Sequence, residues 1–162
     1  MIRSDKNFAK KHSHSPHKGN VIIWFKDYTI EEVKSLISNE SMSDQLGIEF
    51  IEVGKDYLKA RMPVDKRTCQ PFGMLHGGAT CVLAETIGSI ASLMSVNLKQ
   101  KYAVGSVISA NHLRSVISGH VEATCTAIHI GRQKHVWRIL VHSDKGKLIA
   151  TCELTCAVID KF

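Results

Sequence analysis

Residues 79–96 have the sequence ATCVLAETIGSIASLMSV, and Glu85 is the only charged side chain in this stretch. An apolar run of this length predicts a long helix that is buried in the core of a soluble domain. A membrane span is the alternative by length, but Glu85, several hydroxyl side chains and the alternating segments that follow argue against it. A buried carboxylate is costly unless it is paired or used, so Glu85 is the first candidate for chemistry.

The segments around this helix predict an antiparallel sheet. The helix is expected from about Met74 to Asn97, and a capping box of Thr29 and Glu32 predicts a short helix over residues 30–37. Alternating apolar and polar side chains predict strands over residues 48–53, 57–64, 104–113, 121–130, 136–142 and 148–159. This order predicts an α+β fold in which the sheet wraps a central helix. A helix that is apolar on nearly all sides also predicts cover from a partner subunit.

The chain of 162 residues predicts one domain, and its formal net charge of +6 is unevenly distributed. Residues 1–20 contain five Lys and Arg side chains and one Asp, so they carry +4 and leave +2 for the other 142 residues. We expect residues 1–20 to be a loosely ordered basic tail and residues 21–162 to form a single domain with a helical N-terminal segment. A domain of such low net charge is not expected to bind nucleic acid.

Cysteine usage indicates a reducing compartment. The chain has five cysteines and no CxxC pair, which disfavours a disulfide framework or a zinc ribbon and predicts a cytoplasmic protein. The histidines show no ligand spacing, so we expect no metal site.

A second chemical feature precedes the helix, where residues 69–78 have the sequence CQPFGMLHGG. The amides of Gly77 and Gly78 at a helix start suit an oxygen that carries negative charge. His76 and Glu85 are nine residues apart, so on one helix they point in opposite directions and lie roughly 13–14 Å apart along the axis. Joint action at one reacting atom therefore requires two chains, related by two-fold symmetry. Ser89 shares a helix face with Glu85.

Each of these residues also has a purely structural interpretation. His76 would cap the helix, Glu85 would pair with an arginine, and Ser89 would bond the carbonyl one turn back. A serine hydrolase is disfavoured because the chain has no GxSxG motif and no Ser on a strand-to-helix elbow. The residue types alone leave the role of Glu85 open.

Two groups of residues carry a resemblance to a known family. The first is QPFGMLHGGA at 70–79 with AETIGS at 84–89, and the second is ANHLRSV at 110–116 with HIGRQ at 129–133 and Trp137. Together they resemble the hotdog-fold acyl-CoA thioesterases, and more narrowly the PaaI-like branch with the 1,4-dihydroxy-2-naphthoyl-CoA and enterobactin-proofreading thioesterases. The resemblance covers about residues 40–160. Relatives often have Pro where this chain has Ser115, a difference that concerns backbone stiffness more than chemistry.

The resemblance implies a hotdog fold and hydrolysis of a CoA thioester. Glu85 then acts as the nucleophile or as the general base for water, and the Gly77 amide donates to the thioester oxygen. Gln70 and His76 orient the thioester or the water, and Ser89 lies beside the acyl group or the attacking water. The sequence does not separate the nucleophile from the general-base role.

Coenzyme A is expected as part of the substrate, and no separate cofactor is expected. Its phosphates are natural partners for arginines and loop amides. The candidates are Arg114 and the turn with Gly131 and Arg132, with His112 near the nucleotide or the pantetheine. The alternative is that these are solvated hairpin charges.

We therefore expect an acyl-CoA thioesterase that dimerises by joining its sheets and assembles as a homotetramer of two dimers, away from membranes. An aromatic acyl group such as hydroxynaphthoyl, hydroxybenzoyl or phenylacetyl is favoured by the resemblance alone. A hotdog hydratase or dehydratase and a non-catalytic acyl-CoA-binding module stay open as other functions. The sequence identifies neither the acyl group nor the choice between CoA and an acyl carrier protein as donor.

Overall fold

The computed structural model describes residues 22–37 and 40–161, so the expected basic tail at residues 1–20 lies outside the described residues. The described part of the chain forms, in order, α1 (Ile30–Ser35), α2 (Met42–Gln45), β1 (Glu49–Val53), β2 (Tyr57–Pro63), α3 (Gly77–Met94), β3 (Lys101–His112), β4 (His120–Ile130), β5 (Lys134–Ser143) and β6 (Leu148–Asp160).

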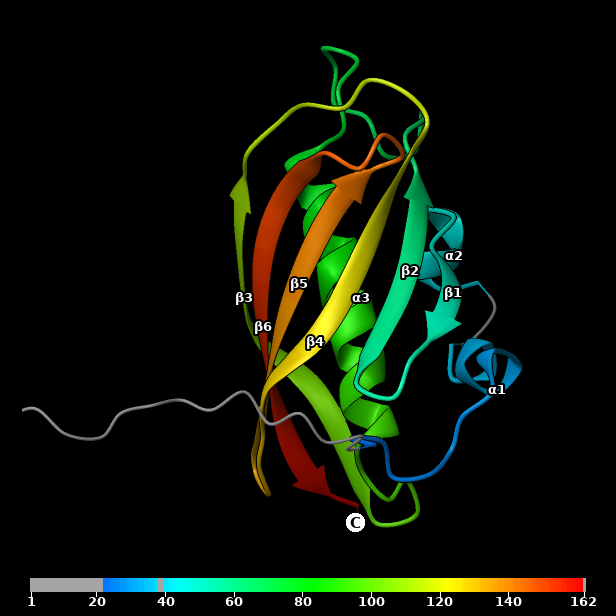
Figure 1. The fold of residues 1–162 in the computed structure, drawn as a ribbon, viewed down its shortest axis with the longest axis vertical. Helices are drawn as coiled ribbons and strands as arrows, with labels where there is room; N and C mark the ends of the chain where they lie inside the picture. Colours follow the sequence, from blue (N-terminus) through cyan, green and yellow to red (C-terminus); the bar gives the residue numbers. More distant parts are fainter. Residues whose placement is uncertain (1–21, 38–39, 162) are drawn as a thin grey trace, which may run out of the picture.

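The strands form one sheet in the order β1-β2-β4-β5-β6-β3, and all pairings are antiparallel. The sheet curves around α3, and α1 and α2 lie on the side of β1 and β2 (Figure 1). This confirms the predicted α+β hotdog arrangement. The predicted capping box is also present, since Glu32 N–H donates to Thr29 Oγ1 and Thr29 N–H donates to the Glu32 carboxylate.

Apolar packing and one buried hydrogen bond hold α3 against the sheet. Leu83 is fully buried, and burial of such a side chain contributes about 1.5–3 kcal/mol. The indole N–H of Trp137 donates to Ser92 Oγ at 2.6 Å. Gly88 permits the close approach of α3 to β6, because a Cβ there would stand 2.5 Å from Leu154 Cδ2. Within the described residues α3 alone has the length and composition of a membrane span, and 56% of it is buried in this fold, as expected for a core helix.

The structure begins α3 at Gly77, three residues later than the sequence predicts, because the preceding backbone pairs elsewhere. Leu75 N–H donates to Val116 O at 2.7 Å, and His76 N–H donates to Thr68 O at 2.8 Å. These bonds keep the residues before α3 extended, and the bond to Val116 joins segments far apart in the sequence.

Strand β3 forms a free edge of the sheet within residues 22–37 and 40–161. It pairs with β6 on one side only, and the side chains of Val104 and Val107 are exposed. The register with β6 shifts between Gly105 and Val107, and Ser106 Oγ donates to Thr155 O at 3.0 Å. An open edge with apolar side chains is a template for another strand, and such irregularities are frequent beside functional sites.

Candidate active site

The loop before α3 brings the first set of predicted residues to the helix start. Gln70 N–H donates to Met74 O at 2.8 Å, and Gly73 N–H donates to Gln70 O at 2.9 Å. Gly73 has a φ of +78°, which favours glycine. His76 Nδ1 accepts a hydrogen bond from Gly78 N–H at 2.8 Å. His76 therefore does cap the helix, and its neutral ring carries the proton on Nε2, where it is a donor.

Gly77 places its backbone N–H at the first position of α3. No described residue accepts a hydrogen bond from this N–H, so it is available to an oxygen that carries negative charge. The imidazole of His112 lies against it, because a Cβ on Gly77 would stand 2.9 Å from His112 Nε2. Gln70, Gly77, Thr80, His112 and Arg114 line one groove of about 390 Å³, which we call the amide groove.

Glu85 lies where α3 faces the edge strand. Its carboxylate is so close to Gly105 that a Cβ there would stand 2.6 Å from Oε1. The expectation of a buried carboxylate is wrong for the single chain, since Glu85 is exposed and no described residue forms an ion pair with it. The physical reason is that the sheet ends at β3, beside Glu85. Glu85 and Ser89 line a second groove of about 470 Å³, which we call the carboxylate groove.

The two sets of predicted residues lie in separate grooves of one chain. Helix α3 is continuous from Gly77 to Met94, so the eight positions from Gly77 to Glu85 span about 12 Å along its axis. Gln70 and Gly77 line the amide groove, and Glu85 and Ser89 line the carboxylate groove. One chain therefore does not bring the Glu85 carboxylate to the Gly77 amide.

The cysteine thiols on and near α3 are not suited to act as the nucleophile in place of Glu85. Burial raises the pKa of Cys81, and the nearby Glu85 carboxylate raises it further. Burial also raises the pKa of Cys156, and it raises the pKa of Cys152 to about 11. All three remain protonated at neutral pH and are weak nucleophiles in that state. Among the described residues that line the carboxylate groove, Glu85 is the only acidic or basic side chain.

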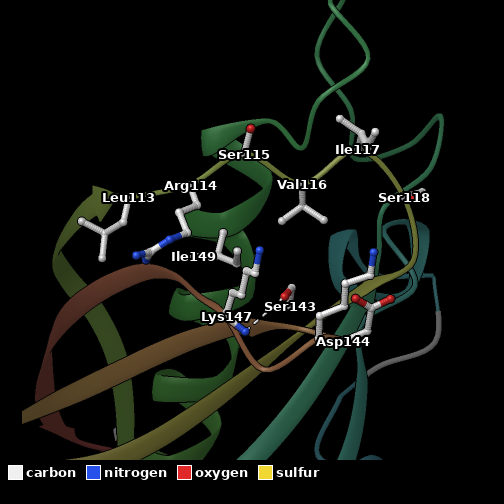
Figure 2. A pocket seen from close by; sticks show the side chains of 11 residues that line it. Leu113, Arg114, Ser115, Val116, Ile117, Ser118, Ser143, Asp144, Lys147 and Ile149 are labelled. Carbon is white, nitrogen blue, oxygen red and sulfur yellow. Dashed lines mark hydrogen bonds between the residues drawn. The ribbon is translucent and has the colours of Figure 1, made fainter.

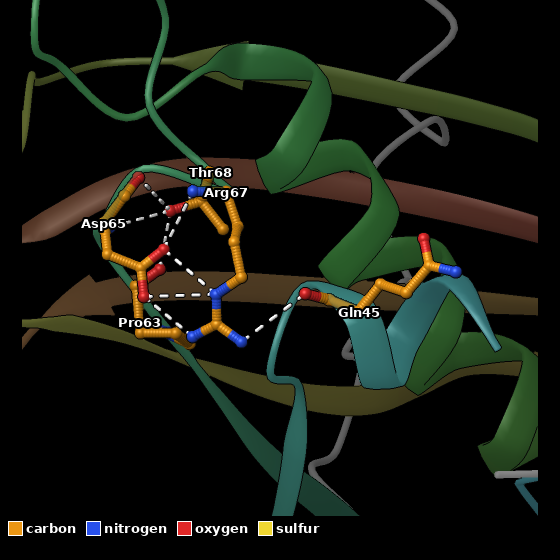
Figure 3. Close-up of polar contacts among 5 residues, drawn as sticks. All are labelled: Gln45, Pro63, Asp65, Arg67 and Thr68. Carbon is orange, nitrogen blue, oxygen red and sulfur yellow. Dashed lines mark hydrogen bonds and ion pairs between the residues drawn. The ribbon is translucent and has the colours of Figure 1, made fainter. Parts of the chain in front are cut away.

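Arg67 connects the loop before α3 to α2 (Figure 3). Its Nη2 lies 2.7 Å from Asp65 Oδ2, and its Nη1 donates to Gln45 O at 3.4 Å. This guanidinium lowers the pKa of the Asp65 carboxyl. Thr68 Oγ1 donates to Pro63 O at 2.7 Å and accepts from Asp65 N–H at 3.0 Å. Because α2 borders the carboxylate groove, these contacts fix the position of one groove relative to the other.

Arg114 follows β3 and lines a third groove of about 500 Å³ as well as the amide groove (Figure 2). Its Nη1 donates to Leu148 O at 2.7 Å. Lys145 and Lys147 line the third groove from the turn before β6, and Asp144 is the one acidic residue among the described residues of that lining. Such a surface suits phosphate groups. The local sequence pattern places neither lysine beside Arg114, because that position depends on the pairing of β6 with β3.

The turn between β4 and β5, which contains Gly131 and Arg132, lies at the opposite end of the sheet from the end of β3, after which Arg114 follows (Figure 1). The end of β3 pairs with Ala150 of β6, whereas the start of β5 pairs with Ala157. These two positions are about 23 Å apart along the strand. The structure therefore does not bring the two arginines together within one chain.

Comparisons with known proteins give a consistent family. The model of the family described as "Thioesterase superfamily" matches residues 72–150. The 1,4-dihydroxy-2-naphthoyl-CoA hydrolase of Escherichia coli is 43% identical over 138 residues, which cover 85% of this chain and 100% of that protein. The proofreading thioesterase EntH of Cronobacter turicensis is 42% identical over 138 residues, which cover 85% of this chain and 99% of that protein.

Solved structures agree with these relatives. The crystal structure of a mutant thioesterase from Pseudomonas aeruginosa has a TM-score of 0.83 at 45% identity and covers 86% of this chain and 99% of that one. A thioesterase from Haemophilus influenzae has a TM-score of 0.81 at 46% identity, with 85% and 95% covered. The chain thus belongs to the thioesterase superfamily, and it is a thioester hydrolase with the hotdog fold.

Proposed function

We propose that the chain hydrolyses acyl-CoA thioesters at sites that two subunits share. The observation that carries this proposal is the placement of Gly77 and Glu85 in separate grooves, with Glu85 beside the free edge of the sheet. An amide donor and a carboxylate are the two groups that thioester hydrolysis needs at the carbonyl. A second copy of the chain is the simplest source of the missing half of each site.

Strand β3 is the edge through which two chains pair in this proposal. Antiparallel pairing of two β3 edges, with Gly105 opposite His112 of the partner subunit, carries Glu85 of one chain to the helix start of the other. The two-fold axis then passes near Ile108 and Ser109, and both sites form at once. The same contact covers the exposed Val104 side chain and satisfies the backbone groups of both edges.

In this dimer the substrate carbonyl oxygen accepts a hydrogen bond from Gly77 N–H, which stabilises the developing oxyanion. As general base, Glu85 takes a proton from water while the water oxygen bonds to the carbonyl carbon; the C–S bond then breaks and the proton passes to the CoA sulfur. As nucleophile, Glu85 instead attacks the carbonyl carbon and forms a mixed anhydride, while the C–S bond breaks and the CoA thiolate leaves and takes up a proton; water then hydrolyses the anhydride to the acid and the free Glu85 carboxylate. His76 Nε2–H and the Gln70 amide orient the carbonyl or the water, and Ser89 lies beside the acyl group.

The cationic groove around Arg114 supplies partners for the coenzyme phosphates. Lys145 and Lys147 extend this surface, and His112 contacts the nucleotide or the pantetheine at the mouth of the amide groove. Arg132 and the Gly131 amide lie at the far end of the sheet, so they reach the same coenzyme only from another subunit.

An aromatic acyl group is favoured, because the relative named 1,4-dihydroxy-2-naphthoyl-CoA hydrolase is 43% identical to this chain. We further propose that the chain is PaaI-like and works in the cytoplasm as a homotetramer of two dimers. The five free cysteines agree with a reducing compartment.

The test is a panel of aromatic and aliphatic acyl-CoA esters, with thiol release followed by Ellman's reagent. Wild type should release thiol, and Glu85→Gln should lower kcat by about 10²–10⁴-fold. The matched control is Glu153→Gln, a change of the same kind at an exposed position of β6, which should retain wild-type turnover. Full turnover by Glu85→Gln would remove Glu85 from the mechanism.

A further inference from the structure

The carboxylate groove has a wall that the proposed mechanism does not use. Residues 30–37 and 40–45, which we call the α1–α2 segment, contribute Leu36, Ile37 and Met42 to the lining opposite α3. Leu36 and Ile37 pack against the hydrophobic core, whereas the Met42 side chain is 64% exposed. Ser43 Oγ lies 3.2 Å from Thr86 Oγ1 and joins α2 to α3 by a hydrogen bond. The wall is therefore apolar and is fixed to the helix that carries Glu85.

No cationic side chain of the described residues lines this groove. Lys34 of α1 is paired with Glu31 at 3.0 Å, and α2 carries Asp44 and no basic residue. The groove thus offers apolar surface, hydroxyl groups and the negative charge of Glu85.

We propose that the α1–α2 segment is the wall of the acyl pocket and restricts this chain to acyl groups without a charge at their far end. The inference rests on the proposed function, because it takes Glu85 as the group beside the thioester carbon. A carboxylate that enters the groove loses hydration, finds no cationic partner there, and is repelled by Glu85. A neutral hydroxyl is accepted, since Ser43 and Thr86 supply donors and acceptors for it.

The test uses thioesters that differ in charge and little in shape. One pair is 4-carbamoylbenzoyl-CoA and 4-carboxybenzoyl-CoA, and the other is pentanoyl-CoA and glutaryl-CoA. Thiol release gives kcat/KM for each ester. In both pairs wild type should hydrolyse the neutral member at least about tenfold better than the charged one.

Substitution of Met42 tests the wall directly, because this exposed side chain tolerates replacement without loss of the core. Met42→Lys should lower the ratio of kcat/KM for the neutral ester to kcat/KM for the charged ester by about tenfold, because the lysine supplies a cationic partner for the carboxylate. Met42→Gln is the uncharged control and should leave the ratio near that of wild type. Ile128→Lys adds the same charge at an exposed position of β4, away from the groove, and should also leave the ratio unchanged.

The outcomes separate the inference from the function on which it rests. Equal hydrolysis of both members by wild type, or an unchanged ratio in Met42→Lys, overturns the acyl wall and leaves the thioesterase assignment intact. The absence of thiol release from every ester, including the wider acyl-CoA panel, overturns the proposed function and the inference with it.

Discussion

The Glu85 carboxylate and Gly105 are in such close contact that a Cβ on Gly105 would stand 2.6 Å from Glu85 Oε1. One residue is on the core helix and the other is on the edge strand, beside its register shift. The glycine therefore sets the position of the carboxylate at the free edge of the sheet. This contact links the edge strand to the proposed chemistry.

Gly105→Ala should displace the carboxylate with little effect on folding. The clash involves the far end of a flexible side chain, so the thermal unfolding midpoint should change little. A displacement of about 1 Å at a reacting group lowers turnover by up to about 10². Steady-state kinetics beside a thermal melt checks this, and wild-type kcat in a folded variant would show that Gly105 does not position Glu85.

Gly77→Pro should remove the oxyanion donor while keeping the helix. Proline is accepted at the first helical position, and His76 has the extended φ and ψ of −73° and 131° that a residue before proline requires. The matched control is Gly77→Ala, which adds the same Cβ beside His112 and keeps the N–H. Turnover of the proline variant should be about 10²–10³-fold below that of the alanine variant. Equal turnover of the two would exclude the Gly77 amide as a donor to the oxyanion.

Arg132→Ala should raise KM for CoA esters more than it lowers kcat, because a contact to the coenzyme phosphates contributes equally to ground state and transition state. Arg114→Ala should likewise raise KM more than it lowers kcat. Steady-state kinetics at several salt concentrations measures both effects. An unchanged KM in either variant removes that arginine from the coenzyme site.

The buried His135 side chain should make the free energy of unfolding fall at acid pH. Its side chain is 1% exposed, and its Nδ1 has no hydrogen-bond partner among the described residues. Burial is the largest effect and lowers the pKa of His135; a hydrogen bond with the Gly131 backbone raises it in part, and the nearby His129 lowers it, so the net direction is downward. Below about pH 6.5 the His135 imidazole is therefore protonated in the unfolded chain, while in the folded chain it stays neutral until the pH reaches its lower pKa.

This contribution to stability is complete above about pH 6.5 and is lost as the pH falls toward the folded-state pKa. His135→Phe keeps an aromatic ring next to Trp137 and removes the titrating group. Urea unfolding at pH 7.5 and 5.5 should show a smaller loss of free energy of unfolding for the variant than for wild type. Equal losses would contradict a role for His135.

The fold and the division of the site follow from patterns that are local in the sequence. The apolar run around Glu85 and the alternating segments predict a helix wrapped by a sheet, which the structure confirms. The spacing of His76 and Glu85 predicts their separation, because helix geometry fixes it. The resemblance adds the hotdog fold, which the comparisons confirm.

What the sequence does not reveal depends on contacts between distant segments. The start of α3 is displaced to Gly77 by the hydrogen bond from Leu75 to Val116. Glu85 is exposed because the sheet ends beside it, and the composition of the helix contains no signal for that edge. Lys147 lies beside Arg114 only because β6 pairs with β3. The local sequence pattern therefore does not identify Lys145 or Lys147 as partners for the coenzyme phosphates.

The most direct test of a shared site is complementation between two inactive chains. Glu85→Gln and Gly77→Pro variants are unfolded and refolded together, so that half of the dimers contain one chain of each kind. Each mixed dimer then has one site with both defects and one site with none, and the mixture should regain about one quarter of wild-type turnover. A mixture with no more activity than the two separate variants would show that Glu85 and Gly77 act within one chain, and the shared site would be wrong.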